Sequence, residues 1–170
     1  FDIDHCYSVA NTGLYSEKGT GGNLPCGEVY IPPNNTNGRL VIDGSIRTLQ
    51  STILVENLVT IKIKDGSIKS IRGKPEGDVL EQNLQWAYSM SSRHGENVRK
   101  VGEFGIGINP GASICGPNVL NEKTLGTAHI AFGSNAWFGG TIYARTHLDQ
   151  VFRDAKVFID GKELVLKKPR

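Results

Sequence analysis

Two Asp-Gly dipeptides constrain the fold of this chain more than any other feature, because each lies between short runs rich in apolar and β-branched residues. Asp65-Gly66 separates Leu58–Lys64 from Ser67–Arg72, and Asp160-Gly161 has an equivalent setting. The commonest two-residue hairpin turn needs a positive φ at both central residues, which Asp and Gly adopt at low cost. Each dipeptide therefore predicts an antiparallel β-hairpin. The runs that flank the second dipeptide are Lys156–Ile159 and Lys162–Leu166.

Other short runs have the composition of strands, and one longer segment has the periodicity of a helix. The chain contains 21 glycines, and many of them separate these runs. Further strands are expected over Gly27–Ile31, Arg39–Ile46, Thr52–Val55, Val101–Asn109, Gly126–Gly133 and Thr141–Phe152. Apolar residues recur at helical spacing in Glu76–Arg93, which predicts the one principal helix, with Trp86 and Tyr88 as packing residues. A second, shorter helix is expected over Asn118–Thr124.

The predicted fold class is α+β, with a mainly antiparallel or mixed β-sheet, β-hairpins and one principal inserted helix. A chain of 170 residues fits one domain that can bury a core without disulfides or metal ions. Within it, residues 1–20 are interpreted as an N-terminal connector and Lys167-Lys168-Pro169-Arg170 as a basic tail. The chain begins at Phe1 without an initiator Met, so we expect it to be the C-terminal part of a longer protein.

Charge and cysteine content exclude several classes of partner. The 19 basic and 17 acidic residues are nearly balanced, and no basic stripe interleaved with aromatic residues indicates a nucleic-acid partner. The apolar runs are too short to span a bilayer, so no membrane partner is expected. Cys6, Cys26 and Cys115 are odd in number and form no Cys-x-x-Cys pair. This argues against a disulfide framework or a thiolate zinc site and favours the cytoplasm.

His147-Leu148-Asp149 is the stretch that says most about function. In an extended chain alternate side chains share a face, so His147 and Asp149 point the same way and Leu148 points the opposite way. An imidazole beside a carboxylate makes half of a metal site or of an acid–base pair. The alternative is a salt-bridged pair at the surface, which an isolated His-x-Asp usually forms.

Val101–Asn109 divides into two different faces if it is a strand. Phe104, Ile106 and Ile108 form an apolar face, whereas the opposite face carries Glu103 and two glycines. Glycine weakens a strand, and its use therefore indicates a bulge or the close approach of another group. This pattern predicts that a ligand or another group lies close to Glu103. The alternative is an exposed edge strand with an ordinary surface Glu.

His129 and Glu28 complete the set of candidate residues. His129 is surrounded by small and apolar residues, which leave room beside it but also fit a hydrogen-bonded core histidine. Glu28 lies in an apolar run, where a carboxylate is costly to bury unless it is paired or binds a metal. Two His, one Asp and two Glu suit zinc, cobalt or manganese, and the two extra carboxylates are what two neighbouring metal ions need.

These segments, in this order, resemble the aminopeptidase T / aminopeptidase S family of dinuclear, leucyl aminopeptidase-like metallopeptidases. The resemblance covers residues 21–164, and it is carried by Leu24-Pro25-Cys26-Gly27-Glu28-Val29, Gly102-Glu103, His129-Ile130-Ala131-Phe132-Gly133 and His147-Leu148-Asp149. It implies two divalent ions (Zn, Co or Mn), a homodimer and an N-terminal α/β domain that precedes this chain. The implied metal ligands are Glu28, Glu103, His129, His147 and Asp149.

The resemblance also implies a metalloaminopeptidase that hydrolyses the N-terminal residues of peptides through a metal-activated water. Glu103 is the candidate proton shuttle. The family places a catalytic Tyr seven residues after its third ligand, where this chain has Ala136. Tyr143, which follows Gly139-Gly140, is the candidate to replace it. The expected substrate is a peptide or another small molecule.

Two other functions remain open. His129, His147 and Asp149 alone make a two-His-one-carboxylate set, which suits mononuclear Fe(II). Ring-cleaving dioxygenases similar to the same family use such a set, so an Fe(II) dioxygenase is the first alternative. The second is a non-catalytic module for dimerisation or small-molecule binding.

Overall fold

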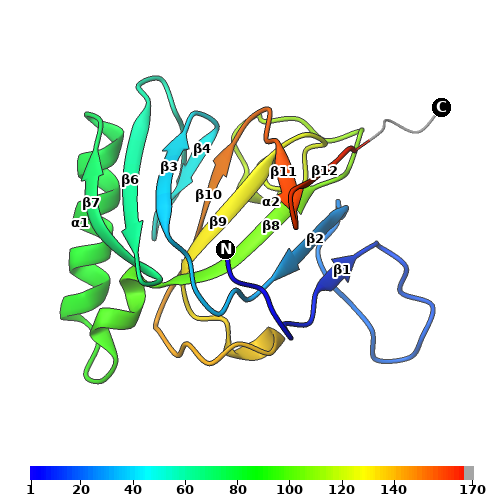
Figure 1. Cartoon of the computed structure of the whole chain (residues 1–170), viewed down its shortest axis with the longest axis horizontal. Helices are drawn as coiled ribbons and strands as arrows, with labels where there is room; N and C mark the ends of the chain where they lie inside the picture. Colours follow the sequence, from blue (N-terminus) through cyan, green and yellow to red (C-terminus); the bar gives the residue numbers. More distant parts are fainter. Residues whose placement is uncertain (167–170) are drawn as a thin grey trace.

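The computed structural model describes residues 1–166, so the basic tail predicted over residues 167–170 lies outside the described residues. The largest unit is a seven-stranded sheet with the spatial order β1-β2-β8-β9-β10-β4-β5, in which all neighbours are antiparallel (Figure 1). Its strands are β1 (Val9–Asn11), β2 (Glu28–Ile31), β4 (Ser45–Arg47), β5 (Thr52–Leu54), β8 (Val101–Gly107), β9 (Ala128–Gly133) and β10 (His147–Phe152).

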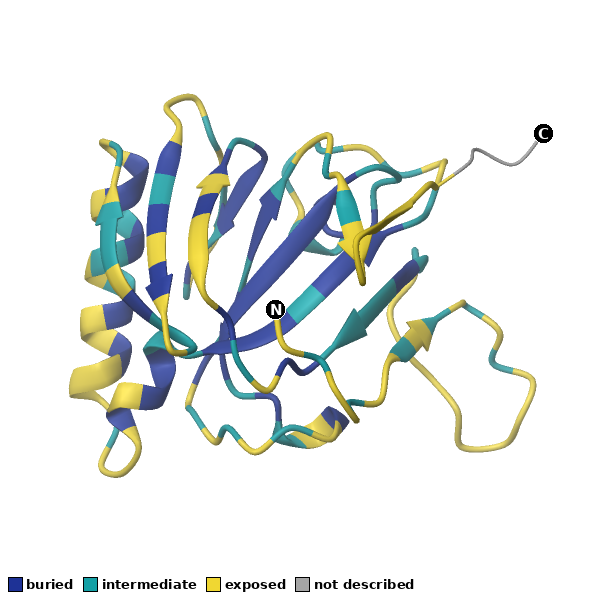
Figure 2. Ribbon diagram, viewed as in Figure 1, coloured by how far each residue is buried: buried dark blue, intermediate teal, exposed yellow. Residues whose placement is uncertain are grey.

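Strands β8 and β9 lie inside this sheet and are among the most deeply buried parts of the molecule (Figure 2). The alternative of an exposed edge strand for Val101–Asn109 is therefore wrong, because β8 is hydrogen-bonded to β2 on one side and to β9 on the other. One face of these central strands packs on the apolar core, and the other carries polar and charged groups.

Both predicted hairpins are confirmed. The first joins β6 (Val59–Lys64) to β7 (Ser67–Arg72) through Asp65 and Gly66, whose φ values of 52° and 68° are both positive. With β3 (Gly38–Ile42) they form a three-stranded sheet of order β3-β6-β7. The second hairpin pairs β11 (Val157–Ile159) with β12 (Lys162–Leu164), and Asp160 and Gly161 again have positive φ. The predicted α+β class is confirmed.

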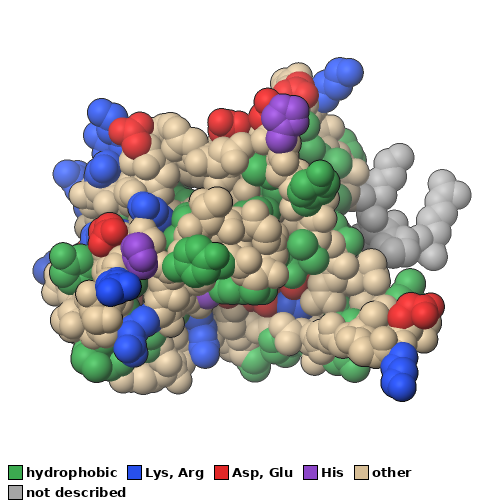
Figure 3. All heavy atoms as spheres, turned by 90° about the horizontal axis from the view of Figure 1, so that it is seen from below, with side chains coloured by type: hydrophobic (Ala, Val, Ile, Leu, Met, Phe, Trp, Pro, Cys, Tyr) green, Lys and Arg blue, Asp and Glu red, His purple; other side chains and the backbone are tan. Residues whose placement is uncertain are grey.

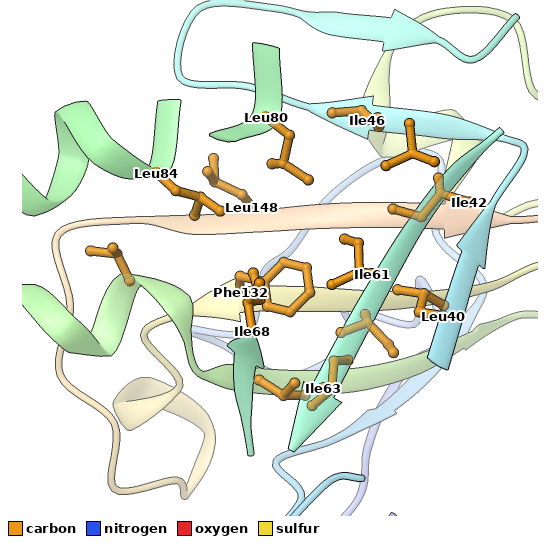
Figure 4. Packing of buried hydrophobic residues seen from close by; sticks show 14 of the residues in the cluster. Leu40, Ile42, Ile46, Ile61, Ile63, Ile68, Leu80, Leu84, Phe132 and Leu148 are labelled. Atoms are coloured by element: carbon orange, nitrogen blue, oxygen red, sulfur yellow. The ribbon is translucent and has the colours of Figure 1, made fainter. Parts of the chain in front are cut away.

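The core lies between the two sheets and helix α1 (Glu76–Ser89), as Figure 4 shows. Leu80 and Leu84 from the helix are fully buried, and each such leucine contributes about 1.5–3 kcal/mol through the removal of its side chain from water. The other sources of core residues are both sheets, which contribute among others Ile42, Ile46, Ile61, Ile63, Ile68, Phe132 and Leu148.

The principal helix is shorter than its predicted span, and two of its aromatic residues lie outside the core. It ends at Ser89, after which a 3-10 turn, η1 (Gly95–Arg99), leads into β8. Trp86 and Tyr88, expected as packing residues, are instead exposed. Helical spacing therefore identified the element correctly but made its buried face too wide.

Three other predicted spans differ from the structure. Arg39–Ile46 is divided between β3 and β4, because the chain passes from one sheet to the other at Gly44, whose N–H donates to the Val151 carbonyl at 3.1 Å. A Cβ at Gly44 would lie 2.6 Å from that oxygen, so only glycine fits this crossing. Within the span Thr141–Phe152 only β10 is a strand, and the second helix is the single turn α2 (Asn118–Asn121).

The apolar face predicted for Val101–Asn109 lies on the side of the sheet away from the charged groups. Phe104, Ile106 and Ile108 line a largely apolar hollow of about 730 Å³, together with residues of β2 and of the β11–β12 hairpin. Among the described residues, no helix is long and apolar enough to cross a membrane.

Candidate metal centre

Strand register brings two of the candidate carboxylates into one row across the centre of the large sheet. Glu103 on β8 pairs with Ala131 on β9, and Ala131 pairs with Asp149 on β10. Residues that pair directly across an antiparallel sheet share a face. The methyl group of Ala131 therefore leaves open space between the Glu103 and Asp149 carboxylates, toward which His147 also points by strand alternation.

The neighbouring row explains the glycines of β8. Gly105 pairs with His129, and a Cβ at Gly105 would lie 2.0 Å from Nε2 of that ring. A Cβ at Gly107 would lie 2.2 Å from the Thr124 carbonyl oxygen. The face that the sequence predicted to be kept open is thus filled by the His129 imidazole and by the chain leading to it. A β-bulge between Val101 and Glu103 adjusts the register of this strand, as bulges near functional sites often do.

Four side chains, which we call the histidine half, converge on this face: Glu103, His129, His147 and Asp149. Nε2 of His129 lies 3.0 Å from Oε1 of Glu103, and Nε2 of His147 lies 3.4 Å from Oε2 of the same carboxylate. Nε2 of His147 is also 3.2 Å from Oδ1 of Asp149. One potential ligand atom each from Glu103, His129 and Asp149 falls within 4.8 Å of the others. Two imidazole nitrogens and carboxylate oxygens at this spacing suit a divalent transition metal.

A hydrogen bond outside the cluster orients His147. Its Nδ1–H donates to the Ser134 carbonyl oxygen at 2.7 Å, which directs Nε2 toward the carboxylates. Metal-binding histidines characteristically use their second nitrogen in this way, because the bond fixes both the ring orientation and the tautomer. The His147 side chain is 20% exposed and Trp137 packs against it with ring centroids 4.8 Å apart, whereas His129 is fully buried. The solvent-facing side of the cluster is therefore beside His147.

A second group, which we call the lysine half, adjoins the first and consists of Glu28, Asn118, Glu122 and Lys123. The Lys123 side chain is completely buried, with Nζ 3.0 Å from Oε1 of Glu28 and 2.6 Å from Oε1 of Glu122. Asn11 donates to Oε1 of Glu28 at 3.2 Å. A buried ammonium between two carboxylates has the paired setting that such a charge requires.

Two contacts join the halves into a closed ring of eight side chains. Oε2 of Glu28 lies 3.8 Å from Nε2 of His129. On the other side Nδ2 of Asn118 donates to Oδ2 of Asp149 at 3.0 Å and also to the Glu122 carboxylate. Figure 3 shows the molecule from below, with charged and histidine side chains on much of the surface and small recessed areas of the same colours near the centre. The ring is a buried, highly charged site.

The carboxylates favour positive charge on both histidines. Burial alone would lower the pKa of His129, but the hydrogen bond and the charge of Glu103 outweigh it and raise this pKa to about 9. Burial also opposes the charged form of His147, yet hydrogen bonds to Asp149 and Glu103 raise its pKa to about 11. Since a metal ion and a proton compete for the same imidazole nitrogens, a divalent cation can replace the protons that hold the site together.

The pKa of Asp149 in the histidine half and the pKa of Glu122 in the lysine half are shifted in opposite directions. Burial would raise the pKa of Asp149, but its hydrogen bond to His147 and the charge of that ring lower it to about 2. Burial and the charge of Asp149 raise the pKa of Glu122 to about 7. Burial would lower the pKa of Lys123, but the charge of Glu122 raises it. The site therefore holds concentrated negative charge that cations must balance.

The structure brings all five predicted ligands to one site but leaves the predicted tyrosine outside it. Glu28 belongs to the lysine half, and the other four form the histidine half. The Tyr143 side chain is 66% exposed, and within residues 1–166 no hydrogen bond links its hydroxyl to the cluster. Its backbone carbonyl accepts a hydrogen bond from Nδ2 of Asn97 at 2.9 Å.

Sequence reasoning missed three members of the ring: Asn118, Glu122 and Lys123. They lie on and just after the single-turn helix α2, in a polar stretch that has the composition of a surface loop. The only signal available was proximity, because Glu122 and Lys123 precede His129 by a few residues. Such proximity is too common to indicate a buried ion pair.

Comparison with solved structures shows the fold. The structure of 2,5-dihydroxypyridine dioxygenase from Pseudomonas putida KT2440 superposes with a TM-score of 0.66 at 22% identity, over 82% of this chain and 42% of that one. Wild-type AmpT from Thermus thermophilus superposes with a TM-score of 0.64 at 18% identity, over 89% of this chain and 40% of that one. The relationship to aminopeptidase T is thus a similarity of structure.

Sequence comparison points to the dioxygenase. A 2,5-dihydroxypyridine 5,6-dioxygenase of Pseudomonas putida (strain KT2440) is 24% identical over 170 residues, which are 94% of this chain and 47% of that protein. The chain thus spans about half the length of this relative, an enzyme named for a small-molecule substrate.

The expectation of a hydrolytic aminopeptidase is wrong. The sequence relative is a dioxygenase, and the family model that matches residues 1–168 describes a 2,5-dihydroxypyridine 5,6-dioxygenase. The first alternative drawn from the sequence, a dioxygenase, agrees with both findings. The error arose because the fold of this chain is similar both to the dioxygenase structure and to the AmpT structure, so a resemblance at the level of the fold does not specify the reaction. Matched along nearly all of its length, the chain belongs to the NicX family.

Proposed function

We propose that this chain carries the iron-binding part of a ring-cleaving dioxygenase, in which His129, His147 and Asp149 hold one Fe(II) ion. The observation that carries the proposal is the convergence of Nε2 of His147 with Oδ1 of Asp149 at 3.2 Å, beside a buried His129 that shares Glu103 with His147. Two histidines and one carboxylate with open positions are the usual ligand set of non-haem Fe(II) oxygenases. Family membership supports the same chemistry.

The bound ion supplies the redox chemistry that lets O₂ react with an electron-rich ring. The chain's own residues prepare the site for it. The Ser134 carbonyl keeps the proton of His147 on Nδ1 and so presents the lone pair of Nε2. The full burial of His129 excludes water from the inner side of the site.

Glu103 is the candidate acid–base residue in this proposal. Its carboxylate oxygens lie 3.0 Å and 3.4 Å from the two Nε2 atoms, so it adjoins any molecule bound beside them. A hydroxylated ring becomes more electron-rich when a hydroxyl group loses its proton, and a buried carboxylate within hydrogen-bond reach can accept that proton. The Glu103 role predicted from sequence, that of a proton carrier, is kept here for a different reaction.

The proposed substrate class is a hydroxylated aromatic or heteroaromatic ring. Trp137 stands at the open side of the cluster, edge-on to His147 with an interplanar angle of 66°, and its side chain is largely exposed. An exposed indole offers a flat surface on which a planar ring can stack. The named substrate of the relatives, 2,5-dihydroxypyridine, has this shape and is the first compound to test.

The test is oxygen consumption by the purified 170-residue chain, loaded anaerobically with Fe(II) and mixed with 2,5-dihydroxypyridine. We expect O₂ uptake that requires iron and is lost in Asp149→Ala. Bound iron without O₂ uptake would overturn the reaction but keep the metal site. Failure to bind iron at all would overturn both.

Two expectations from the aminopeptidase resemblance enter the same experiments. The pair of Zn, Co or Mn ions is replaced here by one Fe(II), and metal analysis of the loaded chain distinguishes them. The homodimer is kept as a proposal, and size-exclusion chromatography with light scattering tests it. Cytoplasmic location also stays a prediction.

A further inference from the structure

We propose that Lys123 is a built-in cation that occupies the place of a second metal ion. Its ammonium holds Glu28 and Glu122, so the ring takes a single ion, bound in the histidine half. This inference rests on the proposed function, because it presumes that the histidine half binds a metal. It gives Glu28 a different partner from the metal ion that the resemblance implied.

The first support is the position of the ammonium. Nζ of Lys123 lies within 3.0 Å of both carboxylates, touching Oε1 of each, and the side chain has no exposure to solvent. A divalent ion bound by the same two oxygens would have to lie where Nζ is. The carboxylates of the lysine half therefore already have their cation.

The second support is that Lys123 cannot easily move away. Its backbone carbonyl accepts a hydrogen bond from the Asn109 N–H at 2.9 Å, and the next residue, Thr124, forms a β-bridge with Asn109. The chain around Lys123 is thus attached to the end of β8. An exposed lysine could swing into solvent to admit a metal, but a buried one has no such path.

The third support is the balance of charge around the ring. It contains four carboxylates, on Glu28, Glu103, Glu122 and Asp149, and one permanent cation. One divalent ion added to the ammonium leaves a net charge of about −1. A second divalent ion would have to bind Glu28 and Glu122 beside the ammonium that already contacts both, and like charges repel strongly in a buried site. Lys123 therefore sets the number of ions that the site accepts.

The experiment counts metal ions. The full chain is titrated anaerobically with Fe(II), and separately with Zn(II), then desalted and measured by mass spectrometry of the metals. We expect one ion per chain for the wild type and for Lys123→Arg, which keeps the cation. Lys123→Met removes the cation from a side chain of similar length, and we expect two ions. The double variant Lys123→Met/Glu122→Gln should return to one ion, because it has lost a ligand of the second site.

Each outcome decides a separate point. Two ions in the wild type would overturn this inference and leave a metal-dependent function standing, whereas no ion would overturn both. A folded Lys123→Met that still binds one ion would also overturn it. If Lys123→Met does not fold, Glu28→Gln replaces it. If Glu28→Gln binds the single ion with an affinity within about threefold of the wild type, the result supports the inference. A loss of affinity above about 100-fold, which exceeds the effect of losing a hydrogen-bonding partner of a ligand, contradicts it.

Discussion

The two halves of the charged ring have the same number of carboxylates but different bases, and this difference separates their functions. In the histidine half Glu103 and Asp149 face imidazoles, which can give up a proton and present a lone pair. In the lysine half Glu28 and Glu122 face an ammonium, which has no lone pair while it is charged. Under the proposed function, the base beside each buried carboxylate of this ring therefore decides whether that carboxylate faces the metal ion or a structural ion pair.

The largest effect is expected from His147→Ala, which removes a base from the histidine half. We expect Fe(II) affinity to fall by more than about 100-fold, because the loss of a mere hydrogen-bonding partner of a ligand already costs about 10–100-fold. Calorimetric titration under anaerobic conditions measures it. His94→Asn, at an exposed position with a φ of 59° that asparagine tolerates, is the control and should bind iron normally. Equal affinity in both variants would remove His147 from the site.

The second effect compares one carboxylate from each half. Glu103→Gln keeps the shape of a side chain that reaches both histidines but removes its charge, and we expect iron affinity to fall by about 10–100-fold. Glu28→Gln is the matched change in the lysine half, where Lys123 is the main partner, and should alter iron affinity far less. If the two substitutions reduced affinity equally, the division of the ring into halves would be wrong.

The third effect tests whether the His129 ring needs the space that Gly105 leaves free. Gly105→Ala places a methyl group where Nε2 of that ring lies, at 2.0 Å, in the middle of a rigid sheet. We expect a loss of about 1–3 kcal/mol in the free energy of unfolding, as for other overpacked sites, together with weaker iron binding. Gly21→Ala is the control, since nothing lies within 4 Å of its Cβ. Denaturant unfolding and iron titration of both variants make the comparison.

The features that could be predicted from the sequence are those that depend on residues close together in the chain. The hairpin at Asp65-Gly66 and the shared face of His147 and Asp149 depend on adjacent residues, so turn chemistry and strand alternation were sufficient. The glycine-lined face of Val101–Asn109 also predicted a close neighbour, which the structure identifies as the His129 ring. Features encoded in a few consecutive residues were thus accessible.

The features that could not be predicted depend on pairing between distant segments. The row Glu103–Ala131–Asp149 exists because β8, β9 and β10 pair in one register, which no local pattern specifies. Lys123 looks like a surface residue in the sequence, because one of its buried ion-pair partners, Glu28, comes from a remote strand. The type of reaction was misjudged for a related reason. The ordered motifs indicated a fold that is similar to two different solved structures, and the motifs did not specify the reaction.

The smallest expected effect comes from a buried carboxylate outside the ring, which serves as a reference for both halves. Oε1 of Glu76 accepts hydrogen bonds from the backbone N–H groups of Glu56 at 3.1 Å and Asn57 at 3.0 Å. The hydrogen bond from its own backbone N–H, followed by those from Asn57 and Glu56, outweighs burial and holds the pKa of Glu76 below its usual value. Glu76→Gln should therefore lower the free energy of unfolding at pH 7 by about 1 kcal/mol and leave iron binding unchanged.

The difference in unfolding free energy between wild type and Glu76→Gln should depend on pH in one direction. Because the pKa of Glu76 is lower in the folded state, its contribution is complete above the unfolded pKa of about 4.5 and is lost as pH falls through the folded value. The difference in unfolding free energy between wild type and Glu76→Gln should thus begin to shrink as pH falls below about 4.5 and should disappear below the folded pKa. Glu56→Gln, at an exposed neighbouring side chain, is the control and should match the wild type throughout. If Glu76→Gln altered iron binding, a buried charge outside the ring would influence iron affinity. This result would contradict the proposal that iron affinity depends on the half of the ring in which a carboxylate lies.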